Sequence, residues 1–164
     1  MADYQARLHA YTEGKDPIAM QHEAPVILKR LIEGVSDSKL QARPAPGKWS
    51  VGEILAHLAE DELATAWRYR QMIEHPGSEL ASFDQDLWAE LGGYASWNAK
   101  EALELFRLLR ATNLRMLAQL GLEDWKKYGV HAERGRLTVS ELVRHMAGHD
   151  MNHIDQVRRI LGRQ

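Results

Sequence analysis

The sequence predicts an all-α fold, a four-helix bundle, from three observations. Three helix-start signals each open an apolar repeat of helical period, and a proline-marked start indicates one further helix before them. A long connection separates the second predicted helix from the third, and no segment alternates convincingly as a β-strand does. Four amphipathic helices bury their apolar faces most simply against one another in a bundle.

The three start signals have the form of a capping box. A polar side chain caps the first turn of the helix, and a Glu three positions later bonds back to the N–H of the capping residue. Asn makes a weaker box than Ser or Thr, so the second signal is the weakest of the three. They occur at Ser50–Glu53, Asn98–Glu101 and Thr138–Glu141.

Proline and glycine set the remaining boundaries. Asp16 and Pro17 suit the start of the first helix, although Pro25 indicates a kink or a later start, and Gly34 ends it. A short helix is expected inside the long connection, and no strand. The predicted ranges are 17–34 with a start at 25 as the alternative, 51–74, 85–91, 99–120 and 139–161.

Length and composition favour a single helical domain over 1–164, with residues 1–15 as a candidate N-terminal extension. The first residues lack the apolar core of a signal peptide, and no apolar run is long enough to span a bilayer. We therefore expect a cytoplasmic protein with no membrane partner. The chain has no cysteine, so any metal must be held by histidine, carboxylate or water.

The charge balance argues against a nucleic-acid partner. Lys and Arg number 21 against 23 Asp and Glu, which gives a formal net charge of -2. Nucleic-acid binders usually carry a basic excess, because neutralising phosphates supplies much of their affinity.

The last predicted helix carries His145, His149 and His153 at steps of four residues. At about 100° per residue, His149 and His153 fall near the centre of the apolar stripe, whereas His145 lies about a quarter-turn away. Burying an unpaired polar group costs about 1–3 kcal/mol, so two buried imidazoles need partners. The pair therefore either binds one cation or consists of core histidines satisfied by Asp, Tyr or water.

The helix predicted over 51–74 offers candidate partners for this pair. His57 lies at the flank of its apolar stripe, although a lone histidine there is more often structural. Asp61 and Glu62 fall toward its inner half, and either could bind a metal, orient a histidine or act as a general base. The alternative for each carboxylate is an ordinary charge facing solvent.

The roles of four other residues stay open at this stage. His145 suits the rim of a site, and His131 could lie near its mouth. Arg68 and Arg70 could bind an anionic carboxylate through paired hydrogen bonds, although surface salt bridges are the more common role. The chain has no serine-hydrolase, P-loop or dinucleotide-binding motif.

Several segments together are typical of one family. They are GKWSVGEILAHLAEDE at 47–62, RYR at 68–70, GRLTV at 135–139 and HDMNHIDQV at 149–157. With these motifs in this order, the chain from about Pro25 to Leu161 resembles the DinB-like superfamily, also called the YfiT-like metalloenzymes. The resemblance implies an up-down-down-up four-helix bundle. It also implies a divalent metal, most often zinc or nickel, held by the histidines that match His57, His149 and His153.

The resemblance further implies an enzyme that acts on a small molecule, and many relatives are homodimers. We expect either an S-transferase that uses a low-molecular-weight thiol as cosubstrate or a metal-dependent hydrolase, with Glu62 or Asp61 transferring protons. The alternative is a non-catalytic stress or interaction protein, in which a closed four-ligand metal site braces the bundle. A metal-free bundle with core histidines is the third possibility.

Overall fold

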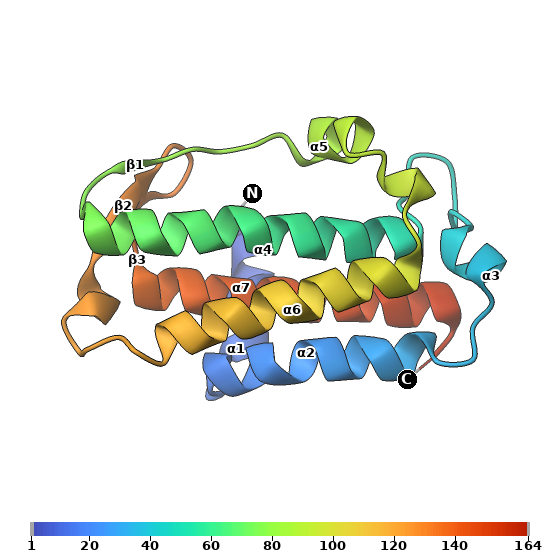
Figure 1. The fold of residues 1–164 in the computed structure, drawn as a ribbon, viewed down its shortest axis with the longest axis horizontal. Helices are drawn as coiled ribbons and strands as arrows, with labels where there is room; N and C mark the ends of the chain where they lie inside the picture. Colours follow the sequence, from blue (N-terminus) through green and yellow to red (C-terminus); the bar gives the residue numbers. More distant parts are fainter. Residues whose placement is uncertain (1, 164) are drawn as a thin grey trace.

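Four long helices form the bundle in the computed structural model, which describes residues 2–163 (Figure 1). Helices α2 and α7 run in one direction and α4 and α6 in the other, so the predicted up-down-down-up arrangement is confirmed. None of the described helices is long and apolar enough to cross a membrane. The bounds are α2 Pro17–Ile32, α4 Val51–Glu74, α6 Ala99–Leu117 and α7 Val139–Leu161.

Capping explains where three of these helices begin. Ser50 Oγ accepts the N–H of Glu53 at 3.1 Å, and Glu53 Oε2 accepts the N–H of Ser50 at 2.7 Å. Thr138 and Glu141 form the same reciprocal pair before α7. The start of α6 is capped from one side, because the Asn98 side chain accepts two N–H groups of the first turn.

Helix α2 continues through Pro25, so the helix starts at Pro17 and does not restart. Proline has no N–H, which leaves the carbonyl oxygen of Gln21, four residues earlier, without its helical donor. The Arg110 guanidinium of α6 donates to this oxygen at 3.2 Å. A neighbouring helix therefore supplies the hydrogen bond that proline cannot.

The N-terminal residues, predicted as a candidate extension, form helix α1, Ala2–Thr12, which packs against α7. Leu8 is buried in this contact. A Cβ added at Gly148 of α7 would overlap the carbonyl oxygen of Leu8. The missing side chain at Gly148 therefore lets α1 lie directly against α7, beside His149.

A three-stranded sheet corrects the prediction that the chain has no strand. Strand β1, Glu79–Leu80, pairs in parallel with β2, Tyr128–His131, which pairs in antiparallel fashion with β3, Gly135–Thr138. Strands of two to four residues are too short for their alternation to stand out from a loop. The sheet closes one end of the bundle, and β3 leads directly into α7 (Figure 1).

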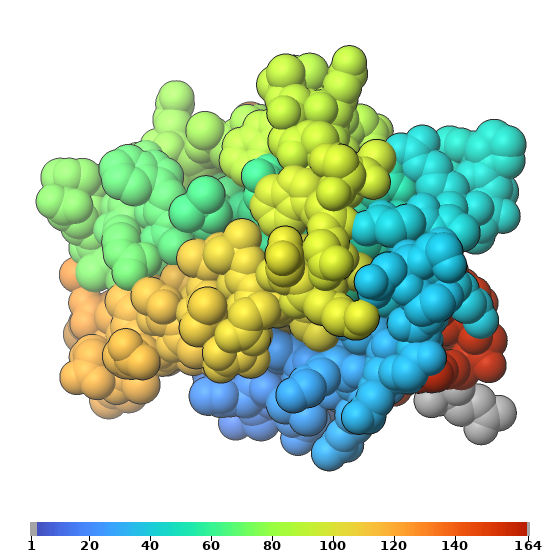
Figure 2. Space-filling model, turned by 45° about the vertical axis from the view of Figure 1, so that its right-hand side comes forward, coloured from blue at the N-terminus to red at the C-terminus, as the bar shows by residue number. Residues whose placement is uncertain are grey.

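The connection from α4 to α6 runs back along the outside of α4, which allows these two helices to be parallel (Figure 1). The predicted short helix is present as α5, Gln85–Leu91. Figure 2 shows this segment in yellow-green, raised above the bundle. Tyr94 anchors the connection, because its buried hydroxyl donates to Glu60 at 2.7 Å. The remaining short helices are α3, Asp37–Gln41, η1, Tyr94–Ser96, and η2, Asp124–Lys126.

The interior contains two hydrophobic clusters, one around the first half of α4 and one near the sheet. Along each long helix, buried polar residues lie between the stretches that contribute to the two clusters. This set, here called the polar layer, crosses the middle of the bundle. Its central members are Gln21 of α2, Glu62 of α4, Arg110 and Asn113 of α6, and Asp150 of α7.

Candidate metal centre

Three histidine rings converge beside the polar layer, and we call them the histidine cluster. His57 comes from α4, and His149 and His153 come from successive turns of α7. The Nε2 atom of His149 lies 3.2 Å from that of His57 and 3.1 Å from that of His153. One ligand atom of each residue lies within 4.8 Å of the others. The structure therefore brings together the three histidines that the sequence singled out.

The geometry of the histidine cluster fits a divalent cation. With metal–nitrogen distances of about 2.0–2.1 Å, tetrahedral ligands lie about 3.3 Å apart, close to the Nε2 separations seen here. Burial lowers the pKa of His57 to about 3, with a further decrease from neighbouring His153, and burial lowers the pKa of His153 to about 4. The rings are therefore neutral near pH 7, as metal ligands must be.

Contacts behind the rings help to orient them. The Nδ1 atom of His153 lies 3.0 Å from Gln156 Oε1, which can only accept a hydrogen bond, so Nδ1 carries the proton and the Nε2 lone pair faces the cluster. His149 Nδ1 is buried and has no hydrogen-bond partner within residues 2–163. Asp61 Oδ2 is 3.5 Å from it. Metal-bound histidines commonly direct this second nitrogen at a carboxylate, and Asp61 is placed for that contact.

Asp61 is the predicted carboxylate that faces the histidine cluster. It lines the same cavity as His57 and His149. Burial raises the pKa of Asp61 to about 7. The nearby Arg68 acts to lower this pKa, and repulsion from Glu62 partly offsets the effect of Arg68. Such a carboxyl group can exchange a proton near neutral pH.

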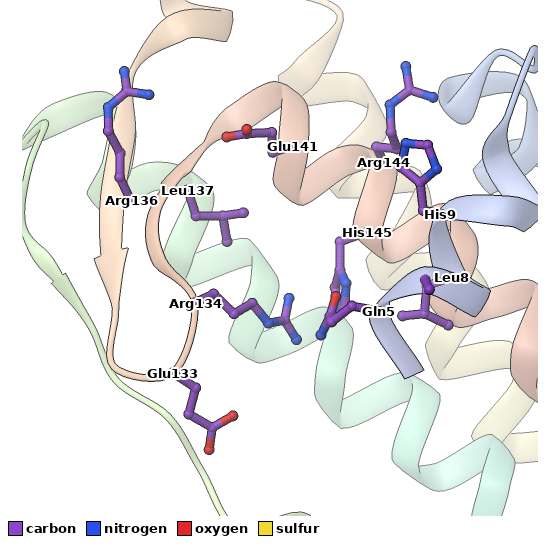
Figure 3. Close-up of a pocket in the computed structure, with 11 residues that line it drawn as sticks. Gln5, Leu8, His9, Glu133, Arg134, Arg136, Leu137, Glu141, Arg144 and His145 are labelled. Atoms are coloured by element: carbon purple, nitrogen blue, oxygen red, sulfur yellow. The ribbon is translucent and has the colours of Figure 1, made fainter. Parts of the chain in front are cut away.

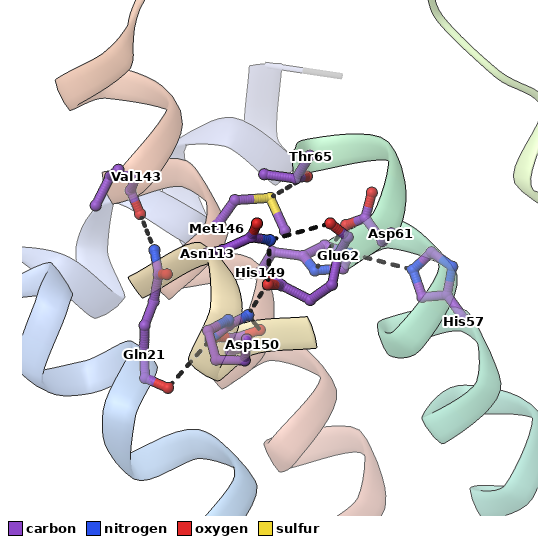
Figure 4. A network of polar contacts seen from close by, with 11 residues as sticks. Gln21, His57, Asp61, Glu62, Thr65, Asn113, Val143, Met146, His149 and Asp150 are labelled. Atoms are coloured by element: carbon purple, nitrogen blue, oxygen red, sulfur yellow. Dashed lines mark hydrogen bonds and ion pairs between the residues drawn. The ribbon is translucent and has the colours of Figure 1, made fainter. Parts of the chain in front are cut away.

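Glu62, the other predicted carboxylate, faces away from the cluster and into the polar layer. Its Oε1 atom accepts from Arg110 at 2.8 Å, and its Oε2 atom accepts from Asn113 at 2.9 Å. Figure 4 shows the Asn113 side chain directed at Glu62, with His57 on the other side of Glu62 from Asn113. Both carboxylate oxygens of Glu62 are therefore occupied by structural contacts.

Arg110 is the centre of these contacts, which we call the arginine network. Its guanidinium bonds both oxygens of Asp150, at 2.5 and 3.0 Å, in addition to Glu62 and the Gln21 carbonyl. The side chain is 1% exposed. The sequence analysis did not identify Arg110. Its spacing of four residues from buried Phe106 could have indicated that it faces the core.

A cavity of about 210 Å³, the inner cavity, opens beside His57 and His149. His131 of β2 and His145 of α7 line it, as expected for residues near the mouth of the site. A larger outer cavity of about 680 Å³ lies between α1, α7 and the β2–β3 hairpin and shares His145 with the inner one (Figure 3). The cluster is therefore buried but approachable through the inner cavity.

Arg68 and Arg70 do not form the surface salt bridges that the sequence favoured. Arg68 donates to the carbonyl oxygen of Ala81 at 2.7 Å, and Arg70 donates to that of Ala66 at 2.8 Å. Neither forms an ion pair within the described part of the chain. Arg68 lines the inner cavity, whereas Arg70 is exposed.

The fold and the site together define a class of protein: an up-down-down-up helical bundle with three neutral imidazoles whose spacing suits a divalent cation. The chain belongs to the DinB superfamily, whose model matches residues 22–157. Among its relatives is a Bacillus subtilis protein named "Putative metal-dependent hydrolase YfiT". It is 23% identical over 167 residues, covering 99% of this chain and 94% of the relative.

Other comparisons agree with this assignment. A protein from Oceanobacillus iheyensis, named "Putative metal-dependent hydrolase OB0782", is 22% identical over 142 residues, covering 87% of this chain and 82% of the relative. The solved structure of Bacillus subtilis YfiT, described as an unusual four-helix bundle, matches with a TM-score of 0.81 at 22% identity, covering 90% and 87% of the two chains. A mycothiol-dependent maleylpyruvate isomerase matches with a TM-score of 0.64 at 13% identity, covering 82% of this chain and 58% of the isomerase.

Proposed function

We propose that the protein is a metal-dependent enzyme whose divalent cation is held by His57, His149 and His153. The observation that carries the proposal is the convergence of three buried Nε2 atoms beside an accessible cavity. Structural zinc sites are usually closed by four protein ligands, whereas catalytic sites keep one position open. Within residues 2–163, no carboxylate or fourth histidine joins the group. This favours an enzyme over a protein braced by a structural metal.

The reaction class that we propose is S-transfer with a low-molecular-weight thiol, with metal-dependent hydrolysis as the second candidate. A bound divalent cation would lower the pKa of a coordinated thiol or water and so supply a nucleophile near neutral pH. Zinc and nickel both suit imidazole donors. The name of the mycothiol-dependent neighbour supports the first class, and the names of the curated relatives support the second.

The residues around the histidine cluster have distinct roles in this proposal. Gln156 fixes the tautomer of His153, and Asp61 orients His149. Asp61 also faces the inner cavity, where it accepts the proton of the incoming thiol or water. Glu62 positions Arg110 instead and takes no part in proton transfer, because both of its oxygens are bonded.

Metal analysis of protein purified without a histidine tag tests the first step. We expect about one zinc or nickel ion per chain in the wild type and almost none in His153→Ala. His145→Ala is the matched control, because His145 lies two turns earlier on α7 and outside the cluster. Equal metal content in wild type and His153→Ala would contradict the proposed ligand set.

Activity assays then separate the reaction classes. The metal-loaded protein is given small thiols with a chromogenic electrophile, and separately an activated ester. Faster thiol conjugation that is lost with the metal supports S-transfer, and metal-dependent ester cleavage supports hydrolysis. Full metal occupancy with neither activity, and a cobalt(II) spectrum unmoved by thiols, would support the structural-metal alternative.

A further inference from the structure

Two guanidinium groups line the inner cavity and form no ion pair within residues 2–163, although the Asp61 carboxylate lies near enough to interact with Arg68. Arg68 comes from α4, and Arg134 comes from the turn that joins β2 to β3. The single hydrogen bond of Arg68 goes to the Ala81 carbonyl oxygen, and Arg134 has no side-chain hydrogen bond in the described chain. Figure 3 shows Arg134 extending toward His145, whereas the Glu133 carboxylate points elsewhere.

The surroundings make these two charges unusual. Both side chains are half-buried, and burial lowers the pKa of each. Repulsion from Arg68 lowers the pKa of Arg134 further. Side chains that repel each other in a partly buried space are stabilised when an anion binds between them.

The charge balance of the inner cavity also favours an anionic ligand. Its lining holds two carboxylates, Asp61 and Glu133, and two guanidinium groups. A divalent cation on the neutral histidines would leave a net formal charge of about +2 in this space. A ligand that brings one negative charge to the metal and another to the arginines balances it.

We propose that Arg68 and Arg134 form a subsite for a carboxylate on the substrate or cosubstrate. The proposal rests on the proposed function and narrows it to small molecules with a metal-binding group at one end and a carboxylate a few bonds away. Guanidinium groups bind carboxylates through paired, charge-assisted hydrogen bonds. The outer cavity begins at Arg134 and His145, so a longer substituent beyond the carboxylate has room to extend there.

Two pairs of probes test the subsite on the cobalt-loaded protein. Mercaptopropionate carries a carboxylate at the end far from the thiol, where mercaptopropanol carries a hydroxyl group. Glutarate carries a second carboxylate that butyrate lacks. Dissociation constants come from changes in the cobalt(II) absorption spectrum and do not require turnover. We expect the wild type to bind the probe with the extra carboxylate at least about tenfold more tightly, as for a charge-assisted hydrogen bond.

The variants Arg134→Gln and Arg68→Gln should each remove most of that preference, and Arg134→Gln should leave the affinity for mercaptopropanol within about twofold. Arg134→Gln is the cleaner variant, because Arg68 also bonds the Ala81 carbonyl. Arg70→Gln is the matched control on α4, since Arg70 is exposed and lines neither cavity. Cobalt content and the melting temperature show whether each variant is folded and loaded.

The outcomes separate the subsite from the proposed function. Equal affinities within each pair in the wild type, or a preference that survives both substitutions, would overturn the subsite. If neither thiol binds but glutarate is preferred and Arg134→Gln removes that preference, the subsite stands and the thiol-dependent reaction falls. A chain that takes up no metal would overturn both.

Discussion

The arginine network and the histidine cluster lie side by side in the middle of the bundle, yet they satisfy their polar groups differently. Neighbouring residues are divided between them: Asp61 and His149 face the cluster, whereas Glu62 and Asp150 face Arg110. The network pairs its charges within the protein, although Arg110 Nε and Asn113 Oδ1 have no hydrogen-bond partner among residues 2–163. The cluster leaves His149 Nδ1 without a hydrogen-bond partner among residues 2–163 and directs three lone-pair donors at one point.

This difference indicates which region is structural and which is functional. A buried charge needs a counter-charge, and the network supplies carboxylates for its guanidinium group from within the protein. The cluster instead brings three buried imidazole nitrogens within 4.8 Å of one another, an arrangement suited to binding a cation. The same helices α4 and α7 support both regions, so substitutions can separate their effects.

The largest effect is expected from breaking the arginine network. Arg110→Met leaves the buried carboxylates of Glu62 and Asp150 without their cation, which should lower the free energy of unfolding by about 3–5 kcal/mol. Urea denaturation in the presence of a chelator measures it. Arg107→Met, on the exposed face of α6, is the control and should change stability little. Similar midpoints for the two variants would show that the network is not a structural centre.

The cluster should contribute to stability through the metal. At zinc or nickel concentrations of about 100 times Kd, the wild type should gain about 2.7 kcal/mol over the metal-free form. His57→Ala should gain almost none, and its metal-free stability is measured alongside as a reference. Calorimetric melting with and without metal measures this gain in stability. An equal gain in both proteins would contradict the assignment of His57 as a ligand.

Gly148→Ala tests whether the cluster side of the bundle depends on α1. The added methyl group meets the Leu8 backbone, which cannot move away without shifting α1, so we expect a loss of about 1–3 kcal/mol. Limited proteolysis should then cut within α1. Gly121→Ala is the control, because a Cβ there makes an ordinary contact at 3.6 Å. An unchanged melting temperature for Gly148→Ala would show that the α1–α7 contact is loose.

The smallest effect is expected at an ordinary helix start, which serves as a reference for the two buried regions. Burial alone would raise the pKa of Glu53, but hydrogen bonds from Arg43 and Ser50 lower it below 4.5. The stabilisation that ionised Glu53 provides is therefore fully present above pH 4.5, and it is lost as the pH falls through the lower pKa of the folded state. Glu53→Gln should cost about 1 kcal/mol at pH 7 and less at pH 3, measured by urea denaturation. A cost that grows on acidification would contradict the assigned sign.

Much of the helical framework could be predicted because local chemistry sets it. The capping boxes located the starts of α4 and α7 correctly, and phase placed His149 and His153 inward. Helix α6 ends at Leu117 rather than 120, because its last residues form tighter turns, with Leu120 N–H bonding Leu117 at 3.2 Å.

The remaining features of the site depend on contacts between segments that are distant in the sequence. Periodicity could not separate Asp61 from Glu62, because both lie toward the inner half of α4 and the position of Arg110 decides between them. Arg134 lies in a hairpin turn, so no helical phase fixes its direction. Arg110 lies within the apolar stripe of α6, and the sequence does not show which distant carboxylates pair with it.

X-ray absorption spectroscopy of the zinc-loaded protein tests the central claim most directly. The account predicts three imidazole nitrogens at about 2.0–2.1 Å and one exchangeable light atom, which mercaptopropionate replaces with sulfur at about 2.3 Å. A metal with four protein ligands whose coordination does not change when the thiol is added would contradict this account. A spectrum without three imidazoles would also contradict it.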